Sequence, residues 1–284
     1  MSAAPSWPPR ALAQDPVRRR LTRTMGKTLV GYQLLAPGDH VLVAVSGGKD
    51  SYTLVDLLWD LQPRAPIQFQ LTAVHLDQGQ PGHDPRPLMD WLEARQIPHA
   101  LITEDTYREV LARTPEGKAY CTVCSRLRRG ILYTVAERIG ATVIALGHHR
   151  DDALETLLLN LTYAGKLQAM PAGYRTDDGR FRVIRPLIEC AESDLQRHAE
   201  AADYPILPCN LCGSQSGLQR VEMKRLLSTL EGKNPNVRQV MLRALQSVHP
   251  SHLLDRSLLA RDRDPDPEDE AAPPEAGRRL PVLQ

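Results

Sequence analysis

No stretch of this 284-residue chain approaches the roughly 20 consecutive apolar residues that a helix needs to cross a bilayer. The first 20 residues are rich in proline and arginine, and they lack the apolar core of a secretory signal peptide. These absences argue against a membrane protein and favour a location in the cytoplasm. Hydrophobic residues still make up 42% of the chain, which suits a soluble globular protein with a full core.

Cysteine is scarce, with five residues in the chain. In a cytoplasmic protein these are not expected to form disulfide bonds, because that compartment keeps thiols reduced. Four of the five form two C-x-x-C pairs, Cys121 with Cys124 and Cys209 with Cys212, so metal or redox chemistry is the better interpretation. We expect the fifth, Cys190, to be a buried apolar thiol.

Net charge is also nearly absent, at +1, but the charges are strongly segregated. Acidic residues and proline are dense between residues 261 and 275, and such a composition predicts a disordered tail. The rest of the chain is therefore more basic than the total suggests. Its densest basic groups are Arg18, Arg19, Arg20, Arg23 and Lys27 near the N-terminus, and Arg126, Arg128 and Arg129 beside the first cysteine pair. Such a surface either contacts nucleic acid or is only a solvated face.

The chain has no Walker A motif, but it has a different glycine-rich turn. The buried apolar run Val41–Val45 leads into Ser46-Gly47-Gly48-Lys49-Asp50-Ser51, and apolar residues at helical spacing follow. The two glycines allow a positive φ and close approach of a ligand, so N–H groups at the helix start can surround an anion. Lys49 adds a cation and Ser51 adds a hydroxyl donor. The pattern predicts a phosphate-binding loop rather than a simple turn between strand and helix.

Segments typical of strands and of helices alternate through the first half of the chain. This order indicates an α/β fold with a doubly wound parallel sheet, in which ligands bind at the carboxyl ends of the strands. The expected strands are Val41–Val45, Phe69–Asp77, His99–Glu104 and Ala141–Leu146, and the expected helices are Ser51–Trp59, Arg86–Gln96, Cys121–Ile139 and Asp151–Leu161. A C-terminal helical extension is predicted from Glu192–Ala202, Leu218–Leu230 and Asn236–Val248.

A second motif, Gly147-His148-His149-Arg150-Asp151-Asp152, follows the last predicted strand. The sheet topology should bring this loop to the same cleft as the phosphate loop, although about a hundred residues separate them. Asp151 at a helix start is either an N-terminal cap or a ligand of phosphate-bound Mg²⁺, with Asp50 as a further ligand. The second reading is the more economical one, because two histidines, an arginine and Asp152 lie beside it.

The cysteine pairs allow two readings on their own. Two C-x-x-C pairs are typical of a structural zinc site with four thiolates. Iron–sulfur clusters use the same ligands, and a cluster with three cysteines leaves one iron open to exogenous sulfur.

Five motifs together resemble those of the tRNA 2-thiocytidine synthetases, the TtcA family, whose ATP-binding loop is known as a PP-loop. They are Ser46–Ser51, Leu76-Asp77-Gln78, Cys121 to Tyr133, Gly147–Asp152 and Pro208 to Gln215. The resemblance spans about residues 20 to 255 and implies a PP-loop domain of the adenine nucleotide alpha hydrolase type. It implies an ATP site made of Ser46, Gly47, Gly48, Lys49, Asp50, Ser51, Asp77, Gly147, His148 and Asp152.

The resemblance also implies the reaction, which is ATP-dependent 2-thiolation of cytidine at position 32 of tRNA. The cytidine O2 attacks the α-phosphate of ATP·Mg²⁺, pyrophosphate leaves, and sulfur then displaces AMP at C2. Lys49, Asp50 and Asp151 are the expected catalytic residues, with Asp50 and Asp151 also holding Mg²⁺. The sulfur passes through a [4Fe-4S] cluster held by Cys121, Cys124 and Cys212, with Cys209 as the less favoured third ligand.

The expected partners are tRNA and a cysteine desulfurase as sulfur donor, and a homodimer is an open alternative to a monomer. The predicted tRNA contact consists of Arg18, Arg19, Arg20, Arg126, Arg128 and Arg129. The rival functions are another PP-loop tRNA modification, such as 2-thiouridine or lysidine synthesis, and a zinc-stapled nucleotide- or RNA-binding module without turnover.

Four regions are expected along the chain. They are a basic N-terminal segment over residues 1–25, the ATP-binding α/β domain over 26–185, a helical region with the second cysteine pair over 186–258, and an acidic, proline-rich tail over 259–284.

Overall fold

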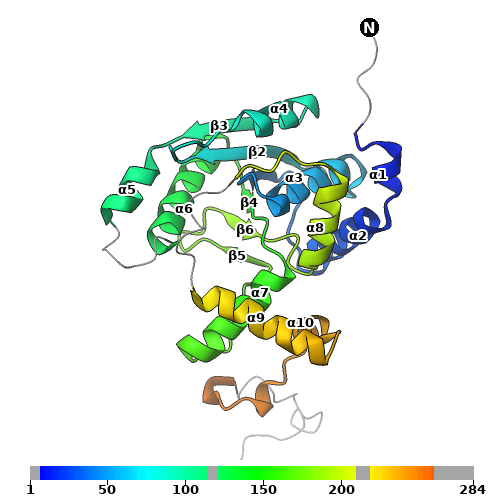
Figure 1. The fold of residues 1–284 in the computed structure, drawn as a ribbon, viewed down its shortest axis with the longest axis vertical. Coiled ribbons are helices and arrows are strands. Elements are labelled where there is room, and N and C mark those ends of the chain that lie inside the picture. Colours follow the sequence, from blue (N-terminus) through cyan, green and yellow to red (C-terminus); the bar gives the residue numbers. More distant parts are fainter. Residues whose placement is uncertain (1–6, 114–120, 209–217, 259–284) are drawn as a thin grey trace, which may run out of the picture. The chain divides into compact units, whose positions relative to one another are not determined.

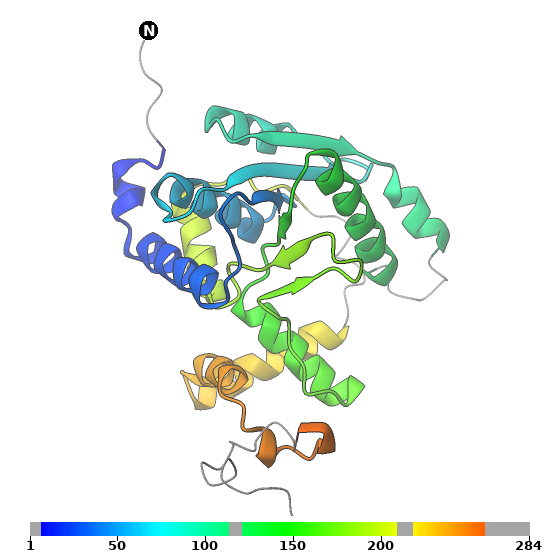
Figure 2. The ribbon, with the colours of Figure 1, turned by 180° about the vertical axis from the view of Figure 1, so that it is seen from behind.

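Six strands form one sheet in the order β3-β2-β1-β4-β6-β5 (Figures 1 and 2). The computed structural model describes residues 7–113, 121–208 and 218–258. All pairs of neighbouring strands are parallel except β5 with β6, which are antiparallel. The strands are β1 (His40–Ala44), β2 (Gln70–Asp77), β3 (His99–Thr103), β4 (Val143–Ala145), β5 (Gly173–Arg175) and β6 (Arg182–Ile184).

The chain builds the sheet outward from β1 in two directions. It proceeds from β1 to β2 and β3 on one side, and then returns to place β4 on the other side of β1. The reversal makes the β1/β4 boundary the topological switch point, where ligands bind in open α/β sheets. The loops after β1 and β4 both begin there, and these are the two loops that carry the predicted motifs.

Helices cover both faces of the sheet. The helices of the described residues are α1 (Arg10–Gln14), α2 (Pro16–Gly31), α3 (Lys49–Leu61), α4 (Arg86–Ala94), α5 (Thr106–Arg113), α6 (Cys121–Arg138), α7 (Arg150–Leu159), α8 (Glu192–Ala201), α9 (Leu218–Lys233) and α10 (Val237–Gln246). Helix α9 packs against α7 rather than on the sheet. Short helical turns are η1 (Gln62–Arg64), η2 (Asn160–Ala164), η3 (Pro250–His252) and η4 (Arg256–Leu258).

Alternate residues of β1 face opposite sides of the sheet, as a strand requires. Val41 and Val43 pack with residues of α2, α3, α4 and α8, whereas Leu42 packs with residues of α6. All three are fully buried. The central strand is therefore apolar on both faces, which explains why it reads as a continuous apolar run.

The chain divides into two units, residues 1–242 and residues 243–284. The first unit contains the sheet, helices α1 to α9 and the part of α10 up to Leu242. The described part of the second unit consists of the end of α10, η3 and η4. Across the residues that the structure describes, no helix combines the length and apolar character needed to cross a membrane.

The predicted doubly wound sheet is confirmed, and its predicted helices and strands lie close to their predicted bounds. The sequence reading missed helices α1, α2 and α5 and the hairpin of β5 and β6. Helix α2 crosses residue 25, where the N-terminal segment was expected to end. The sequence contains a helix-start signal for α2, namely Asp15 followed by Pro16. In the structure the Asp15 side chain caps the helix by accepting a hydrogen bond from the Arg18 N–H, and Pro16 occupies the first turn.

Candidate active site

The turn after β1 has the form of an anion-binding loop. Gly47 has φ of +84°, and Gly48 precedes α3 without a side-chain cap on the helix. The Ser51 hydroxyl accepts a hydrogen bond from the Ser46 N–H at 3.1 Å and donates one to the Gly48 carbonyl at 2.8 Å, which closes the loop on itself. The N-terminus of α3 therefore stays open to an anionic ligand, and the helix dipole favours negative charge there.

The loop after β4 lies directly against this turn. A Cβ atom on Gly147 would lie 3.2 Å from the Asp50 carbonyl carbon and 3.2 Å from the Ser51 nitrogen. A side chain at position 147 would push the two backbones apart by a few tenths of an ångström, and glycine avoids this shift. The expected convergence of the two motifs is confirmed.

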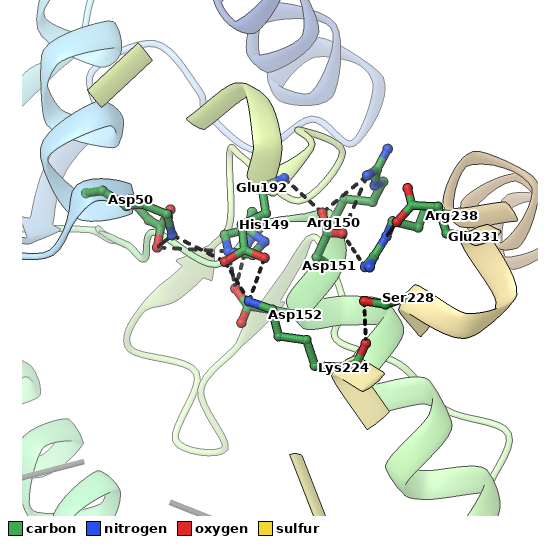
Figure 3. Close-up of polar contacts among 11 residues, drawn as sticks. Asp50, His149, Arg150, Asp151, Asp152, Glu192, Lys224, Ser228, Glu231 and Arg238 are labelled. Atoms are coloured by element: carbon green, nitrogen blue, oxygen red, sulfur yellow. Dashed lines mark hydrogen bonds and ion pairs between the residues drawn. The ribbon is translucent and has the colours of Figure 1, made fainter. Parts of the chain in front are cut away.

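Two carboxylates gather around the buried imidazole of His149 (Figure 3). Its Nε2 atom lies 3.4 Å from Asp152 Oδ2 and 3.9 Å from Asp50 Oδ2. Asp152 also accepts a hydrogen bond from the His149 N–H at 3.0 Å, at the start of α7. Carboxylates from the starts of α3 and α7 thus point into one space.

These residues suit Mg²⁺ only when phosphate is also present. No group of three or more His, Cys, Asp or Glu residues in the described part of the chain is arranged to hold a metal alone. Protein Mg²⁺ sites commonly use one or two carboxylates and complete the shell with water and substrate phosphates. Asp50 and Asp152 beside an anion-binding loop fit that pattern.

Glu192, in the first turn of α8, pairs with two lysines next to the loop, of which Lys224 is labelled in Figure 3. Its carboxylate lies 3.5 Å from Lys49 Nζ and 2.9 Å from Lys224 Nζ of α9. Burial tends to raise the pKa of Glu192, but the hydrogen bond and charge of Lys224, with Lys49, outweigh burial and lower it. The ionised carboxylate therefore keeps two ammonium groups near the site for bound phosphate.

Asp151 does not face this space, which corrects the expectation that it binds Mg²⁺ and takes part in catalysis. Its buried carboxylate accepts hydrogen bonds from the Glu192 N–H at 2.9 Å and from Arg238 Nη1 at 2.7 Å, and it forms an ion pair with Arg150. Burial tends to raise its pKa, yet these partners outweigh burial and lower it. Asp151 therefore joins α7 to α8 and α10, and Asp152 takes the position opposite Asp50.

His148, from the same loop, is neutral at physiological pH. Burial, followed by the positive charge of Arg185, lowers its pKa to about 4. Arg220 of α9 contributes in the same direction, so its charge also acts at this loop.

A cleft adjoins the phosphate loop at the carboxyl ends of β1 and β2. Its polar lining comes from Ser46, His75, Gln78, Gln80, His83 and Arg128, and its apolar lining includes Leu132 and Leu207. His75 Nδ1 lies 2.7 Å from the Val45 carbonyl, and its Nε2 lies 3.0 Å from His83 Nε2. The sequence reading did not single out these histidines, since no motif spacing marks them.

Asp77 lies between Leu76 and Gln78, which line the cleft, and its contact with ATP stays a prediction. The Asp77 carboxylate accepts a hydrogen bond from the Gly79 N–H at 2.9 Å. Asp77 therefore shapes the turn that leads Gln78 and Gln80 along the cleft.

The segment before the second cysteine pair is fixed to the phosphate loop. The Leu207 N–H donates to the Gly47 carbonyl at 2.9 Å, and the Tyr52 hydroxyl of α3 donates to the Pro205 carbonyl at 2.9 Å. A Cβ atom on Gly47 would lie 2.8 Å from the Leu207 side chain. The segment therefore packs directly on the loop that binds the anion.

Each cysteine pair lies close in sequence to a residue that lines the cleft. Cys121 and Cys124 lie one turn apart at the start of α6, and Arg128 lines the cleft one turn further on. Cys209 and Cys212 lie outside the described residues, but Pro208 lines the cleft. The choice of third ligand between these two cysteines stays open. Cys190 is buried and free, as expected.

The predicted arginine surface needs one correction. Arg18 is 2% exposed, and its Nη1 lies 2.6 Å from the buried carboxylate of Asp56. An arginine that is buried and paired in this way cannot contact RNA. Arg20 pairs with Asp194 of α8 on the surface, and the others, Arg19, Arg126 and Arg129, are exposed, while Arg128 is half-buried.

The fold and the site define the class of protein. A strand–turn–helix phosphate loop at the switch point, joined by the loop after β4, is the arrangement of PP-loop proteins, and a family model described as a PP-loop domain matches residues 15–206. Over 245 residues the chain is 50% identical to a tRNA-cytidine(32) 2-sulfurtransferase from Ectopseudomonas mendocina, covering 86% of this chain and 89% of that protein. It is 51% identical to the protein of that name from Sorangium cellulosum, with 86% and 87% covered. The chain therefore belongs to the tRNA-cytidine(32) 2-sulfurtransferase family.

A solved structure shares the fold. The U34-tRNA thiolase of Methanococcus maripaludis, determined with its [4Fe-4S] cluster, aligns with a TM-score of 0.62 at 22% identity, covering 82% of this chain and 80% of that one. At this identity, the likeness shows the fold alone.

Proposed function

We propose that this chain uses ATP to replace the C2 oxygen of cytidine 32 in tRNA with sulfur. The observation that carries the proposal is the convergence at the switch point, where the phosphate loop and the loop after β4 meet beside a cleft lined by Arg128 of α6 and by Pro208. The names of relatives at about 50% identity support the choice of cytidine 32 over another tRNA nucleotide.

In the first step the phosphate loop binds the pyrophosphate end of ATP. N–H groups at the start of α3, together with Lys49, hold the phosphate oxygens, and the nucleoside extends into the cleft beside Ser46. The cytidine O2 attacks the α-phosphorus, and the bond to pyrophosphate breaks. Negative charge that develops on the phosphate oxygens is stabilised by donors already in place, which lowers the barrier without reorganisation.

Asp50 and Asp152 would hold Mg²⁺ against those phosphates. The ion, when bound, neutralises charge on the leaving pyrophosphate. His149 fixes the two carboxylates relative to one another, and the neutral His148 adds no positive charge of its own.

In the second step a sulfur nucleophile adds to C2, and AMP departs with the former carbonyl oxygen. We propose that Cys121, Cys124 and Cys212 hold a [4Fe-4S] cluster, with Cys209 as the alternative third ligand. A cluster held by three cysteines supplies an iron with an open coordination position. A cysteine desulfurase as sulfur donor, a homodimer and a cytoplasmic location stay predictions.

The test pairs Lys49→Ala with Lys27→Ala, a control that removes an exposed lysine of α2, outside the phosphate loop. Pyrophosphate release is measured with tRNA and ATP, and 2-thiocytidine is measured by mass spectrometry of digested tRNA. The Lys49 variant should lose both and the Lys27 variant should keep both. Another modified nucleoside would support the rival PP-loop reactions, and zinc without iron or sulfide, with no pyrophosphate release, would support a binding module.

A further inference from the structure

A surface segment of the first unit, residues 161–168, exposes several large apolar side chains close together. Residues 161–168 are all exposed, and among them Leu161, Tyr163 and Leu167 have 44%, 53% and 61% of their surface accessible. Large apolar side chains grouped in this way commonly mark a contact with a partner.

The segment has a defined conformation. It begins in η2, a π-helical turn at the end of α7, and turns at Gly165 with φ of +60°. The Lys166 N–H bonds the Asn160 carbonyl at 2.9 Å, and the Asn160 side chain bonds the Gln168 carbonyl at 2.7 Å. Such π-helical turns occur frequently at functional sites.

Helix α9 continues the same surface, since it packs against α7 (Figures 1 and 2). The Tyr163 hydroxyl donates to Glu222 at 2.9 Å, and Val221 beside it is 46% exposed. We define the η2–α9 face by seven exposed side chains of η2, of the turn after it and of α9, namely Leu161, Tyr163, Lys166, Leu167, Arg220, Val221 and Arg225.

The η2–α9 face is basic and continuous with the candidate active site. Lys166, Arg220 and Arg225 carry positive charge, whereas the nearby acid Glu222 accepts the hydrogen bond of Tyr163. On the same helix, Lys224 binds Glu192, whose carboxylate reaches Lys49 of the phosphate loop. Helix α7 begins at the loop after β4 and ends at η2, so a macromolecule with one nucleotide in the active site can also reach this face.

We propose that the η2–α9 face is a contact surface for the tRNA substrate, with Lys166 and Arg220 binding phosphates and an unpaired base stacking on Tyr163. The proposal rests on the proposed function, which makes tRNA the substrate. Exposed aromatic rings set among cations form the surface that single-stranded RNA requires, because rings stack on bases and cations replace counterions. The same face of a second copy would set positive charge against positive charge, whereas the phosphates of tRNA are complementary to it.

Filter binding of an unmodified tRNA transcript across several salt concentrations tests the proposal with Tyr163→Ala, Tyr163→Phe and Lys166→Ala. The Tyr163→Ala variant should bind roughly tenfold more weakly, because one stacked base is lost. The Tyr163→Phe variant should bind like the wild type, since stacking does not need the hydroxyl. The Lys166→Ala variant should reduce the log–log salt slope by about 0.7 to 0.9.

The control is Arg64→Ala. The Arg64 side chain is 61% exposed and pairs with the Asp60 carboxylate. Arg64 lies in η1, which follows the C-terminal end of α3, whereas the phosphate loop precedes its N-terminal end. The Arg64→Ala variant should change neither affinity nor slope. Unaltered tRNA binding in Tyr163→Ala and Lys166→Ala would overturn the proposed surface. Wild-type protein that binds no tRNA would instead overturn the proposed function. Sedimentation velocity is run on the same samples. If the wild type is a dimer and Tyr163→Ala becomes a monomer that still binds tRNA normally, the face contacts a second copy and not tRNA.

Discussion

Replacing Arg18 should destabilise the protein and leave tRNA binding unchanged. The Arg18 guanidinium lies 2.6 Å from Asp56 Oδ2 and 3.2 Å from Asp60 Oδ2, and both Arg18 and Asp56 are almost completely buried. Burial alone would raise the pKa of Asp56, but hydrogen bonds from His198, Arg18 and Tyr204 hold it well below its usual range. Asp56 is therefore charged at neutral pH, and Arg18→Met leaves that charge without its guanidinium.

Breaking a buried ion pair on one side costs about 3 to 5 kcal/mol. For a chain of this size, that loss corresponds to a fall of roughly 10 °C in the unfolding midpoint. The assay is urea and thermal unfolding, followed by tRNA filter binding at a temperature where the variant is folded. Arg20→Met is the matched control, since the Arg20 side chain is 51% exposed and its pair with Asp194 is worth at most about 1 kcal/mol.

The double variant Arg18→Met with Asp56→Asn separates charge from packing. It should recover part of the lost stability, because no unpaired carboxylate remains. The reasoning is refuted when Arg18→Met costs less than about 1 kcal/mol, or when the folded variant shows a smaller salt slope for tRNA than the wild type.

Two further predictions concern the phosphate loop and the unpaired thiol. Gly47→Ala should abolish ATP binding measured by calorimetry, because the φ of Gly47 is +84° and a Cβ there would lie 2.8 Å from the Leu207 side chain. The control Gly48→Ala should fold normally, because the nearest atom to its Cβ would be 3.6 Å away. Adding Leu207→Ala to Gly47→Ala should restore part of the binding, and an unimpaired Gly47→Ala variant would contradict the assigned loop geometry. Burial raises the pKa of Cys190 to about 12, so iodoacetamide at pH 8 should modify it only after denaturation, as read by peptide mass spectrometry. Rapid labelling of Cys190 in folded protein would place the thiol on an accessible surface.

Local patterns were enough to predict the elements around the active site. The apolar run of β1, the glycines after it and the helical spacing of α3 are all neighbours in sequence, and the alternation of elements then placed the loop after β4 beside them. The close contact of Gly147 with Asp50 follows from sheet topology alone. Such features need no knowledge of which distant side chains meet.

The errors arose where neighbouring residues of the same type point in different directions. Arg18 and Arg19 differ by about 100° around α2, and Arg18 shares the buried stripe of Leu21 and Met25. That spacing was visible in the sequence and indicates that Arg18 faces the core. Asp151 and Asp152 present the harder case, because the partner of Asp151 is Arg238, 87 residues away, and no local pattern predicts that pair.

The carboxylate of Asp56 joins parts of the chain that are synthesised at very different times. Arg18 and Asp56 emerge early from the ribosome, whereas His198 and Tyr204, which lie 3.4 Å and 2.6 Å from Asp56 Oδ2, follow more than 140 residues later. Until Tyr204 has been synthesised, the Asp56 carboxylate lacks one of the hydrogen bonds that stabilise its charge in the core. The helix behind the phosphate loop therefore reaches its final environment only when the last part of the PP-loop domain has been made. During translation the ATP site is completed from its C-terminal border, although its most recognisable motif lies near the beginning of the chain.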